Sequence, residues 1–201
     1  DGTTKTPTIV YVHGGGWVLG NLETHDRICR VLAEKSEAIV VAVDYRLSPE
    51  AKFPSAVHEV AAVAKHLHEN AGQYGIDADR MGMAGDSGGA HLNLAATLYL
   101  RQEVGDASYI KALLLYYGCY GLIDSASRRL LGGAWDGLTE EDWPFYIGNY
   151  AEDPVAIQNE PYFNLFLNDL SRELHRGSRV RPSEGRLGNS RSNLRAVRNS
   201  L

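Results

Sequence analysis

Gly85-Asp86-Ser87-Gly88-Gly89 is the stretch that decides the fold of this chain of 201 residues. It fits the pattern G-x-S-x-G, in which a serine stands on a sharp turn between a strand and a helix. The short apolar run Arg80–Ala84 precedes it and the helix-like run Ala90–Leu100 follows it, which is the required context. Glycines around the serine allow a strained backbone and remove side chains that would clash. We therefore expect Ser87 to be a nucleophile, the alternative being a serine with only a structural role in the turn.

A second glycine-rich run, His13-Gly14-Gly15-Gly16-Trp17, follows the apolar segment Ile9–Val12. A dinucleotide-binding loop would need a glycine where Leu19 stands, and a phosphate-binding P-loop would need Gly-Lys-Ser or Gly-Lys-Thr. The run instead fits a loop whose backbone N–H groups stabilise the oxyanion that forms when a serine attacks a carbonyl. Gly88, directly after the predicted nucleophile, is expected to supply another N–H group. Together the two runs predict ester chemistry.

Strand-like and helix-like segments alternate regularly from Thr8 to Tyr117. The expected strands are Ile9–Val12, Ala38–Val43, Arg80–Ala84 and Ile110–Tyr117, and the expected helices are Glu23–Ser36, Ser55–Asn70 and Ala90–Leu100. Such an alternation predicts the α/β class, with a parallel sheet covered by helices. Continuous apolar runs are typical of strands that are buried on both faces.

The alternation stops after residue 118, and the chain divides into three parts. Residues 1–118 form the predicted core with the nucleophile elbow. Residues 119–173 are rich in aromatic side chains and short polar turns, which favours a lid or cap of helices packed over a site. Residues 174–201 hold seven arginines, one acidic residue and no aromatic residue. We expect this Arg/Ser-rich tail to be disordered, while an arm that binds polyanions and an out-of-frame C-terminus remain alternatives.

Most other polar residues of note are expected to have structural roles. His13 should hold the glycine loop, and His91, one helical turn past Ser87, should be a buried packing or hydrogen-bonding group. His25 should cap a helix or line the pocket wall. The turn Asp44–Glu50 should support the glycine loop. Expected to lie in solvent on a helix surface are His58, His66 and His68, and His175 in the tail is not expected to be catalytic.

Three of these runs together resemble the marks of the hormone-sensitive-lipase-like esterases, which are α/β-hydrolases that cleave carboxylic esters. They are His13–Trp17, Asp44–Glu50 and Gly85–Gly89, and the stretch Arg128–Thr139 is more specifically similar to bacterial acetyl esterases. The resemblance covers about residues 8–173 and implies an α/β-hydrolase three-layer core with a partial lid. By position it implies Ser87 as the nucleophile and Gly14, Gly15 and Gly88 as oxyanion donors, with His13 in the same motif.

The chain departs from this family pattern on its C-terminal side. The family places an aspartate in a D-P-L-like turn and a histidine in an H-x-F-like turn, and neither pattern occurs after Leu174. The resemblance therefore implies a piece truncated at both ends, without the catalytic Asp and His. We expect a serine esterase for short-chain acyl esters, inactive in the form given. A non-catalytic ligand-binding or regulatory module is the alternative.

Composition narrows the remaining classes. No segment approaches ~18 consecutive apolar residues, so no membrane span is expected. The net charge of −5 combines +6 in residues 174–201 with −11 in the rest, and an acidic body argues against nucleic-acid binding. Cys29 and Cys119 are too few for a disulfide framework and too isolated for a metal site, which suits buried or partly buried thiols in a reducing cytoplasm. The expected partner is a small acyl ester without metal or cofactor, and a homodimer or regulatory partner stays open.

Overall fold

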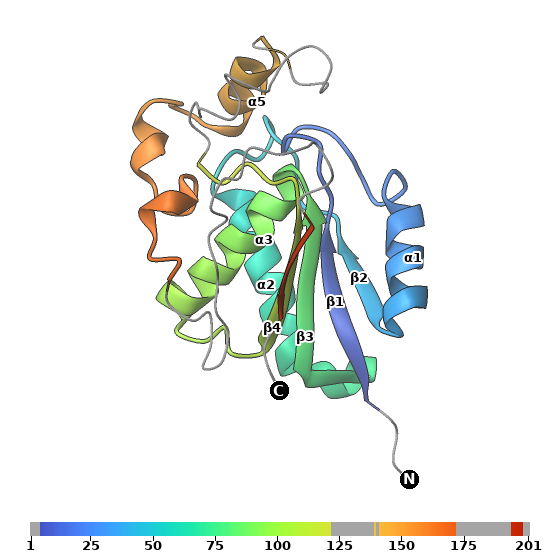
Figure 1. Ribbon diagram of the computed structural model, residues 1–201. Helices are drawn as coiled ribbons and strands as arrows, with labels where there is room; N and C mark the ends of the chain where they lie inside the picture. Colours follow the sequence, from blue (N-terminus) through green and yellow to red (C-terminus); the bar gives the residue numbers. More distant parts are fainter. Residues whose placement is uncertain (1–4, 122–138, 140, 172–193, 199–201) are drawn as a thin grey trace.

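The structure, a computed structural model, describes residues 5–121, 139, 141–171 and 194–198. Its centre is a sheet with the strand order β2-β1-β3-β4-β5 (Figure 1). The strands are β1 (Thr6–Val12), β2 (Ile39–Val43), β3 (Ile76–Asp86), β4 (Ile110–Tyr116) and β5 (Leu194–Arg198). The first four run parallel to their neighbours, and β5 runs antiparallel to β4.

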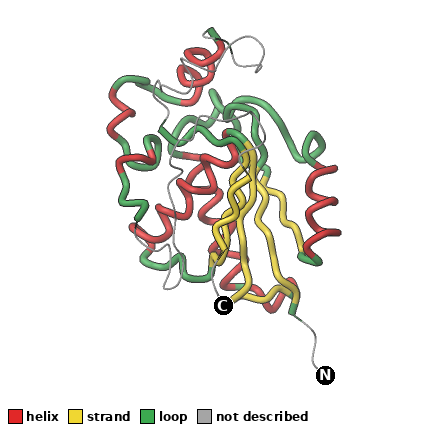
Figure 2. Tube along the Cα trace, in the orientation of Figure 1, coloured by secondary structure: helices red, strands yellow, loops and turns green. Residues whose placement is uncertain are grey.

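Helices cover both faces of this sheet. On one face lies α1 (Asp26–Ser36), and on the other lie α2 (Ser55–Glu69) and α3 (Gly88–Tyr99), as Figures 1 and 2 show. The helices that complete the described chain are η1 (Ala71–Tyr74), η2 (Leu100–Val104), α5 (Asp142–Tyr150), η4 (Ala156–Asn159) and η5 (Leu165–Leu167). The expected α/β class with a parallel, helix-covered sheet is confirmed. None of the helices in the described ranges is long and apolar enough to span a bilayer.

The core is densest around α3, where every residue from Gly88 to Leu98 is buried. This helix packs between the sheet and α2, so both of its faces need small or apolar side chains, which its alanines and leucines provide. By contrast, α1 has no buried residue and packs only one half-buried side against β2. The helix that follows the predicted nucleophile is therefore the most constrained helix of the described chain.

The carboxyl ends of the parallel strands lie level with one another. Val12 pairs with Val43 on one side and with Gly85 on the other, and Gly85 pairs with Leu115. The chain leaves β1 toward α1 on one face and leaves β3 toward α3 on the other (Figure 1). In open α/β sheets a crevice forms at such a switch point, where ligands bind. The glycine loop after β1 and the serine turn after β3 meet there.

Two element boundaries differ from the sequence-based expectation. β3 begins at Ile76 and not at Arg80, because Ile76 pairs with Thr6 although the residues between look like a polar turn. The expectation of a disordered tail is wrong for Leu194–Arg198, which form β5. Their pairing satisfies backbone groups that the edge of β4 would otherwise leave open. The rest of the tail lies outside the described residues, and so does His175.

Candidate active site

Ser87 stands on the turn between the end of β3 and the start of α3, as expected. Its backbone has φ 48° and ψ −118°, a conformation that non-glycine residues rarely adopt. The amide of Ser87 donates a hydrogen bond to the carbonyl oxygen of Tyr116, at 2.9 Å, which ties the turn to β4. A strained serine that is fixed in this way is typical of a nucleophile elbow.

The glycines around Ser87 are required by the close approach of β1. A Cβ atom at Gly89 would collide with the backbone carbonyls of Val12 and His13. A Cβ atom at Gly85 would collide with the same Val12 carbonyl and lie 2.5 Å from Asn93 Nδ2. The elbow and the glycine loop are thus in backbone contact, with no room for side chains between them.

A pocket of about 200 Å³ opens at the elbow. It brings together the elbow, the glycine loop and α5, and its lining residues are Gly15, Gly16, Trp17, Ser87, Gly88, Cys119, Trp143 and Tyr146. Of the predicted site residues, the pocket contains Ser87, Gly15 and Gly88. Gly14 and His13 are not among its lining residues. Cys119 and Gly16 were missed as site residues, and only the folded chain places Cys119 near Ser87.

Three glycines line this pocket, Gly15, Gly16 and Gly88, and each has a backbone amide. The loop turns sharply, with φ +116° at Gly15 and +58° at Gly16, and Val18 and Leu19 donate to the carbonyl of Gly15. A Cβ atom on Gly88 would lie 3.4 Å from the Gly16 nitrogen, so the two amides are close. Within the described residues these three amides donate to no acceptor. They are backbone donors at the pocket that the described residues leave without an acceptor.

Gly14 differs from the sequence-based expectation. Its amide donates to Asp86 Oδ1 at 3.1 Å, so it is already engaged and is not directed at the pocket. Sequence reasoning assigned the first two glycines of the loop as oxyanion donors. The geometry favours the second and third, because the first rests on the carboxylate beside Ser87.

His13 supports the loop from behind. It is buried, its Nδ1–H donates to the carbonyl of Gly14 at 2.8 Å, and its ring stacks on Tyr45 with centroids 4.4 Å apart. Burial lowers the pKa of His13, which keeps the ring neutral. The turn after β2 adds two supports, since Tyr45 Oη donates to the His13 carbonyl at 3.0 Å and the Ser48 amide donates to the Trp17 carbonyl at 2.8 Å. The predicted structural role of this turn is confirmed.

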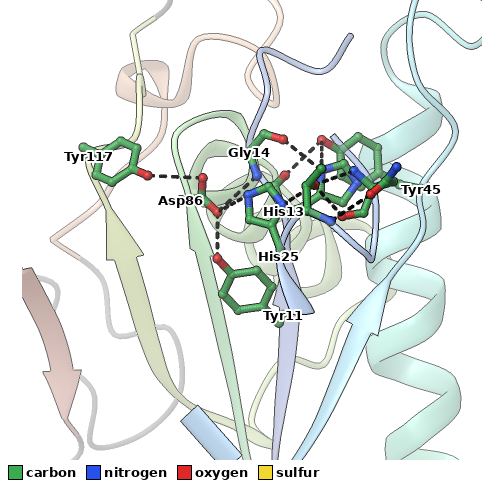
Figure 3. A network of polar contacts seen from close by, with 9 residues as sticks. Tyr11, His13, Gly14, His25, Tyr45, Asp86 and Tyr117 are labelled. Carbon is green, nitrogen blue, oxygen red and sulfur yellow. Dashed lines mark hydrogen bonds and ion pairs between the residues drawn. The ribbon is translucent and has the colours of Figure 1, made fainter. Parts of the chain in front are cut away.

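Asp86 is the centre of a network that sequence analysis did not foresee (Figure 3). Besides the Gly14 amide, its carboxylate accepts hydrogen bonds from Tyr11 Oη at 2.7 Å and Tyr117 Oη at 3.3 Å. His25 Nε2 lies 3.5 Å from Asp86 Oδ1. His25 does occupy the first position before α1, but its side chain makes no capping hydrogen bond and belongs to this network instead.

His91 lies on the other side of the elbow turn, among aromatic rings. It is completely buried, and its Nε2–H donates to the Phe163 carbonyl at 2.9 Å. Trp17 contacts it edge-on at 5.4 Å between centroids and stacks on Tyr150 at 4.4 Å. Burial lowers the pKa of His91 to about 4. The predicted buried role of His91 is confirmed, and a neutral ring held by Phe163 is not placed as a base for Ser87.

The other polar residues singled out in the sequence lie away from the pocket. His58 and His66 are exposed, as expected, whereas His68 is half-buried and stacks on Tyr109 at 4.1 Å. Both cysteines are half-buried and neither forms a disulfide. The described residues contain no cluster of three His, Cys, Asp or Glu side chains that could hold a metal ion. The acetyl-esterase-like stretch Arg128–Thr139 lies outside the described residues except for Thr139.

Comparison with known proteins agrees with this fold. A family model described as the alpha/beta hydrolase fold matches residues 9–176. The chain is similar to a hyperthermophilic esterase from the archaeon Pyrobaculum calidifontis, with 37% identity and a TM-score of 0.79 over 84% of this chain and 54% of that one. It is also similar to a thermostable carboxylesterase cloned from a metagenomic library, with 35% identity and a TM-score of 0.78 over 83% of this chain and 57% of that one. A fungal esterase from Rhizomucor miehei is similar as well, with 35% identity and a TM-score of 0.77 over 84% of this chain and 53% of that one. The chain thus spans little more than half the length of these proteins.

Proposed function

This chain belongs to the α/β-hydrolase fold family, whose model it matches over residues 9–176, and from that premise we propose that it hydrolyses carboxylic esters through an acyl-enzyme on Ser87. The observation that carries the proposal is one pocket containing a strained elbow serine and three unengaged backbone amides. A serine nucleophile and an oxyanion hole are the two parts that acyl transfer needs at the carbonyl. The similarity to carboxylesterases supports the same chemistry.

The reaction follows from these positions. Ser87 Oγ attacks the ester carbonyl carbon, and the carbonyl oxygen becomes an oxyanion within reach of the amides of Gly15, Gly16 and Gly88. Each such donor contributes roughly 3 kcal/mol to transition-state stability in serine hydrolases. The oxyanion then collapses, the C–O bond to the alcohol breaks, and the alcohol leaves with the proton that the base removed from Ser87. Water hydrolyses the acyl-serine in the same way, and Ser87 Oγ regains its proton.

The general base comes from outside the described residues in this proposal. Near the elbow, the rings of His13, His25 and His91 are engaged with the Gly14 carbonyl, the Asp86 carboxylate and the Phe163 carbonyl. Without a base, Ser87 keeps its proton and attacks slowly. We infer that this chain is a weak esterase by itself, with at most the ~10³–10⁴-fold acceleration that an oxyanion hole and binding give alone.

The pocket size supports a small acyl group of the acetyl class. Its volume of about 200 Å³ is below the ~300–1,000 Å³ of sites that hold drug-sized ligands. Its lining includes the aromatic residues Trp17, Trp143 and Tyr146, which narrow the space for an acyl chain. Acetyl and butyryl esters should therefore react with higher kcat/KM than decanoyl esters, and the opposite order would contradict this assignment.

The decisive experiment compares p-nitrophenyl acetate hydrolysis by the chain and by Ser87→Ala, with Ser36→Ala on the exposed surface of α1 as the matched control. Added imidazole supplies an external base, so turnover that depends on Ser87 should rise with its concentration. A diethyl p-nitrophenyl phosphate probe should add its mass to the chain but not to Ser87→Ala. Equal hydrolysis and equal labelling by both proteins would leave the non-catalytic ligand-binding alternative.

A further inference from the structure

We propose that the pocket at Ser87 selects esters whose alcohol carries a quaternary ammonium group, held against the aromatic side chains of Trp143 and Tyr146. The inference rests on the proposed function and narrows it, because it names the class of ester that Ser87 cleaves. Its basis is the lining of the pocket, which places aromatic residues of α5 beside the nucleophile. Among the described residues that line the pocket, none carries a charge.

The aromatic pair comes from one side of α5, since Trp143 and Tyr146 are three residues apart on this helix. Figure 1 shows α5 above the carboxyl ends of the strands, and a Cβ atom on Gly16 would collide with the Tyr146 ring. Trp143 and Tyr146 are both half-buried, so part of each side chain remains open to a ligand. Trp17 differs, because it is 1% exposed and Tyr150 stacks on its ring. The pair from α5 is therefore the aromatic surface that a ligand can contact.

The charges around the pocket favour a cation. The carboxylate of Asp142 directly precedes Trp143, and that of Asp86 directly precedes Ser87. Thr139 donates to Asp142 Oδ2 from its amide at 2.7 Å and from its hydroxyl at 2.8 Å. These hydrogen bonds lower the pKa of Asp142, so its carboxylate is ionised at neutral pH. Residues 1–173 also carry a net charge of −11 (13 basic and 24 acidic residues), and such a field raises the local concentration of cations.

An uncharged aromatic lining suits one kind of cation in particular. Aromatic rings attract a cation through their quadrupole, and quaternary ammonium ligands are recognised in this way. A primary ammonium group would lose hydrogen bonds to water on entry, and the lining offers no carboxylate to replace them. A quaternary ammonium group has no N–H to satisfy, and its methyl groups can pack against the rings. The chemistry therefore points to a choline-type alcohol.

One small ligand can reach both the nucleophile and the aromatic pair, because a single pocket of about 200 Å³ contains Ser87, Trp143 and Tyr146. Ser87 Oγ forms a bond to the acyl carbon, the C–O bond to the amino alcohol breaks, and the alcohol leaves with the proton that the base removed from Ser87. The ammonium nitrogen takes no part in these bond changes. Its contact with the rings lowers KM for the ester.

The binding test does not need catalysis. Choline and 3,3-dimethyl-1-butanol have the same shape and differ in charge, so titration calorimetry of Ser87→Ala with each compound isolates the contribution of the cation. Choline should bind with about tenfold lower Kd. The preference should persist at an ionic strength of about 1 M, where a Debye length of roughly 3 Å screens distant carboxylates but not a ring in contact. Equal Kd values, or a preference that is lost at high salt, would overturn the proposal.

Substitutions on α5 assign the preference to the aromatic pair. In the Ser87→Ala background, Trp143→Leu and Tyr146→Leu should each reduce the choline preference at least threefold, whereas Tyr146→Phe keeps an aromatic ring and should retain it. Phe166→Leu, which alters an exposed ring outside the pocket, is the matched control and should also retain it. An unchanged preference in both leucine variants on α5 would overturn the proposal.

Kinetics with the intact nucleophile complete the test. With imidazole present, acetylcholine should react with about tenfold higher Ser87-dependent kcat/KM than its uncharged counterpart 3,3-dimethylbutyl acetate, mainly through KM. Equal kcat/KM values would contradict the proposal. If neither ester shows Ser87-dependent turnover while Ser87→Ala still prefers choline, the ester chemistry has failed and the cation site stands, so the two failures are distinguishable.

Discussion

The two ends of the glycine loop are held by different physical forces. At Gly14 the loop is fixed by directional hydrogen bonds to a carboxylate whose oxygens have partners. At Trp17 it is fixed by ring packing against Tyr150 and His91. The aromatic end buries three polar atoms, Trp17 Nε1, His91 Nδ1 and Tyr150 Oη, which have no hydrogen-bond partner among the described residues. We therefore expect the hydrogen bonds at Gly14 to set the position of the loop, and the ring packing at Trp17 to contribute more to the stability of the fold.

Among the substitutions that test this comparison, removal of the Tyr150 ring should have the largest effect on the free energy of unfolding. Tyr150→Ala deletes a completely buried ring that stacks on Trp17 and Phe163, and should lower the free energy of unfolding by about 4 kcal/mol. Tyr150→Phe keeps the ring and removes only a hydroxyl that has no partner in the described chain, so its stability should be equal or higher. Urea denaturation of both variants measures the difference. A large loss in Tyr150→Phe would show that the hydroxyl is hydrogen-bonded after all.

A lower pH should destabilise the folded chain at the aromatic end of the loop, because His91 takes up a proton more readily when the chain is unfolded. Its pKa is about 4 in the folded chain against an ordinary 6.5, so the unfolded chain binds the proton first as the pH falls. The stability that the neutral His91 ring gives the folded chain is therefore fully present above pH 6.5 and is lost progressively toward pH 4. The total loss in the free energy of unfolding is roughly 3 kcal/mol.

The measurement is the slope of unfolding free energy against pH between these values. In His91→Phe the slope should be shallower than in the parent chain, whereas His66→Gln, on the exposed surface of α2, should retain the parent slope. Identical slopes for the parent chain and His91→Phe would show that His91 is already protonated in the folded state.

Alanine substitutions at Gly14 and Gly16 should differ in their cost to stability, because they lie at different ends of the loop. Gly14→Ala forces a Cβ against the backbone and carboxylate of Asp86, which cannot move without shifting β3, and should cost about 2 kcal/mol. Gly16→Ala meets the ring of half-buried Tyr146, which can rotate, and its positive φ should cost about 1 kcal/mol. Thermal unfolding of the two variants gives the order. If Gly16→Ala is the more damaging, the cap side is the more rigid one.

A smaller effect than that of Gly14→Ala is expected from Tyr11→Phe. It removes one donor from Asp86 and leaves the Gly14 and Tyr117 contacts, so the free energy of unfolding should fall by about 1.5 kcal/mol. Tyr74→Phe, which alters a half-exposed hydroxyl near His66, is the matched control. Because Tyr150→Phe should cost nothing, the pair of tyrosine-to-phenylalanine changes contrasts the polar and aromatic ends most directly.

Local patterns predicted the architecture well. The apolar runs Ile9–Val12 and Ile110–Tyr117 correspond to β1 and β4, and the glycine spacing around Ser87 predicted the turn from β3 into α3. These features depend on residues close in sequence, where periodicity and backbone requirements act directly. The start of β3 was misplaced because its first pairing with β1, at Ile76, is separated from the next, at Met81, by the polar residues Asp77 to Arg80, which lie at a register shift.

The partners of the site could not be predicted in the same way. Asp86 occupies a variable position of G-x-S-x-G, and nothing near it in sequence indicates that it holds Gly14. Gly14 was expected to be an oxyanion donor, but its amide donates to Asp86, a residue from another strand. Likewise Tyr146 reaches the loop only because α5 packs over it. Such contacts depend on which strands are neighbours, which a pattern along the chain does not encode.

The position of β1 between β2 and β3 also determines when the site can form during folding. Gly14 and Asp86 are separated by 72 residues, so the loop cannot be fixed until β3 has joined the sheet. Contacts this distant in sequence form slowly, since the entropy of closing the intervening chain is lost before they are made. Helices need only local contacts to form, so Ser87 reactivity should appear after helical circular dichroism has recovered. During refolding, a reactive serine is thus a marker for the late docking of β3.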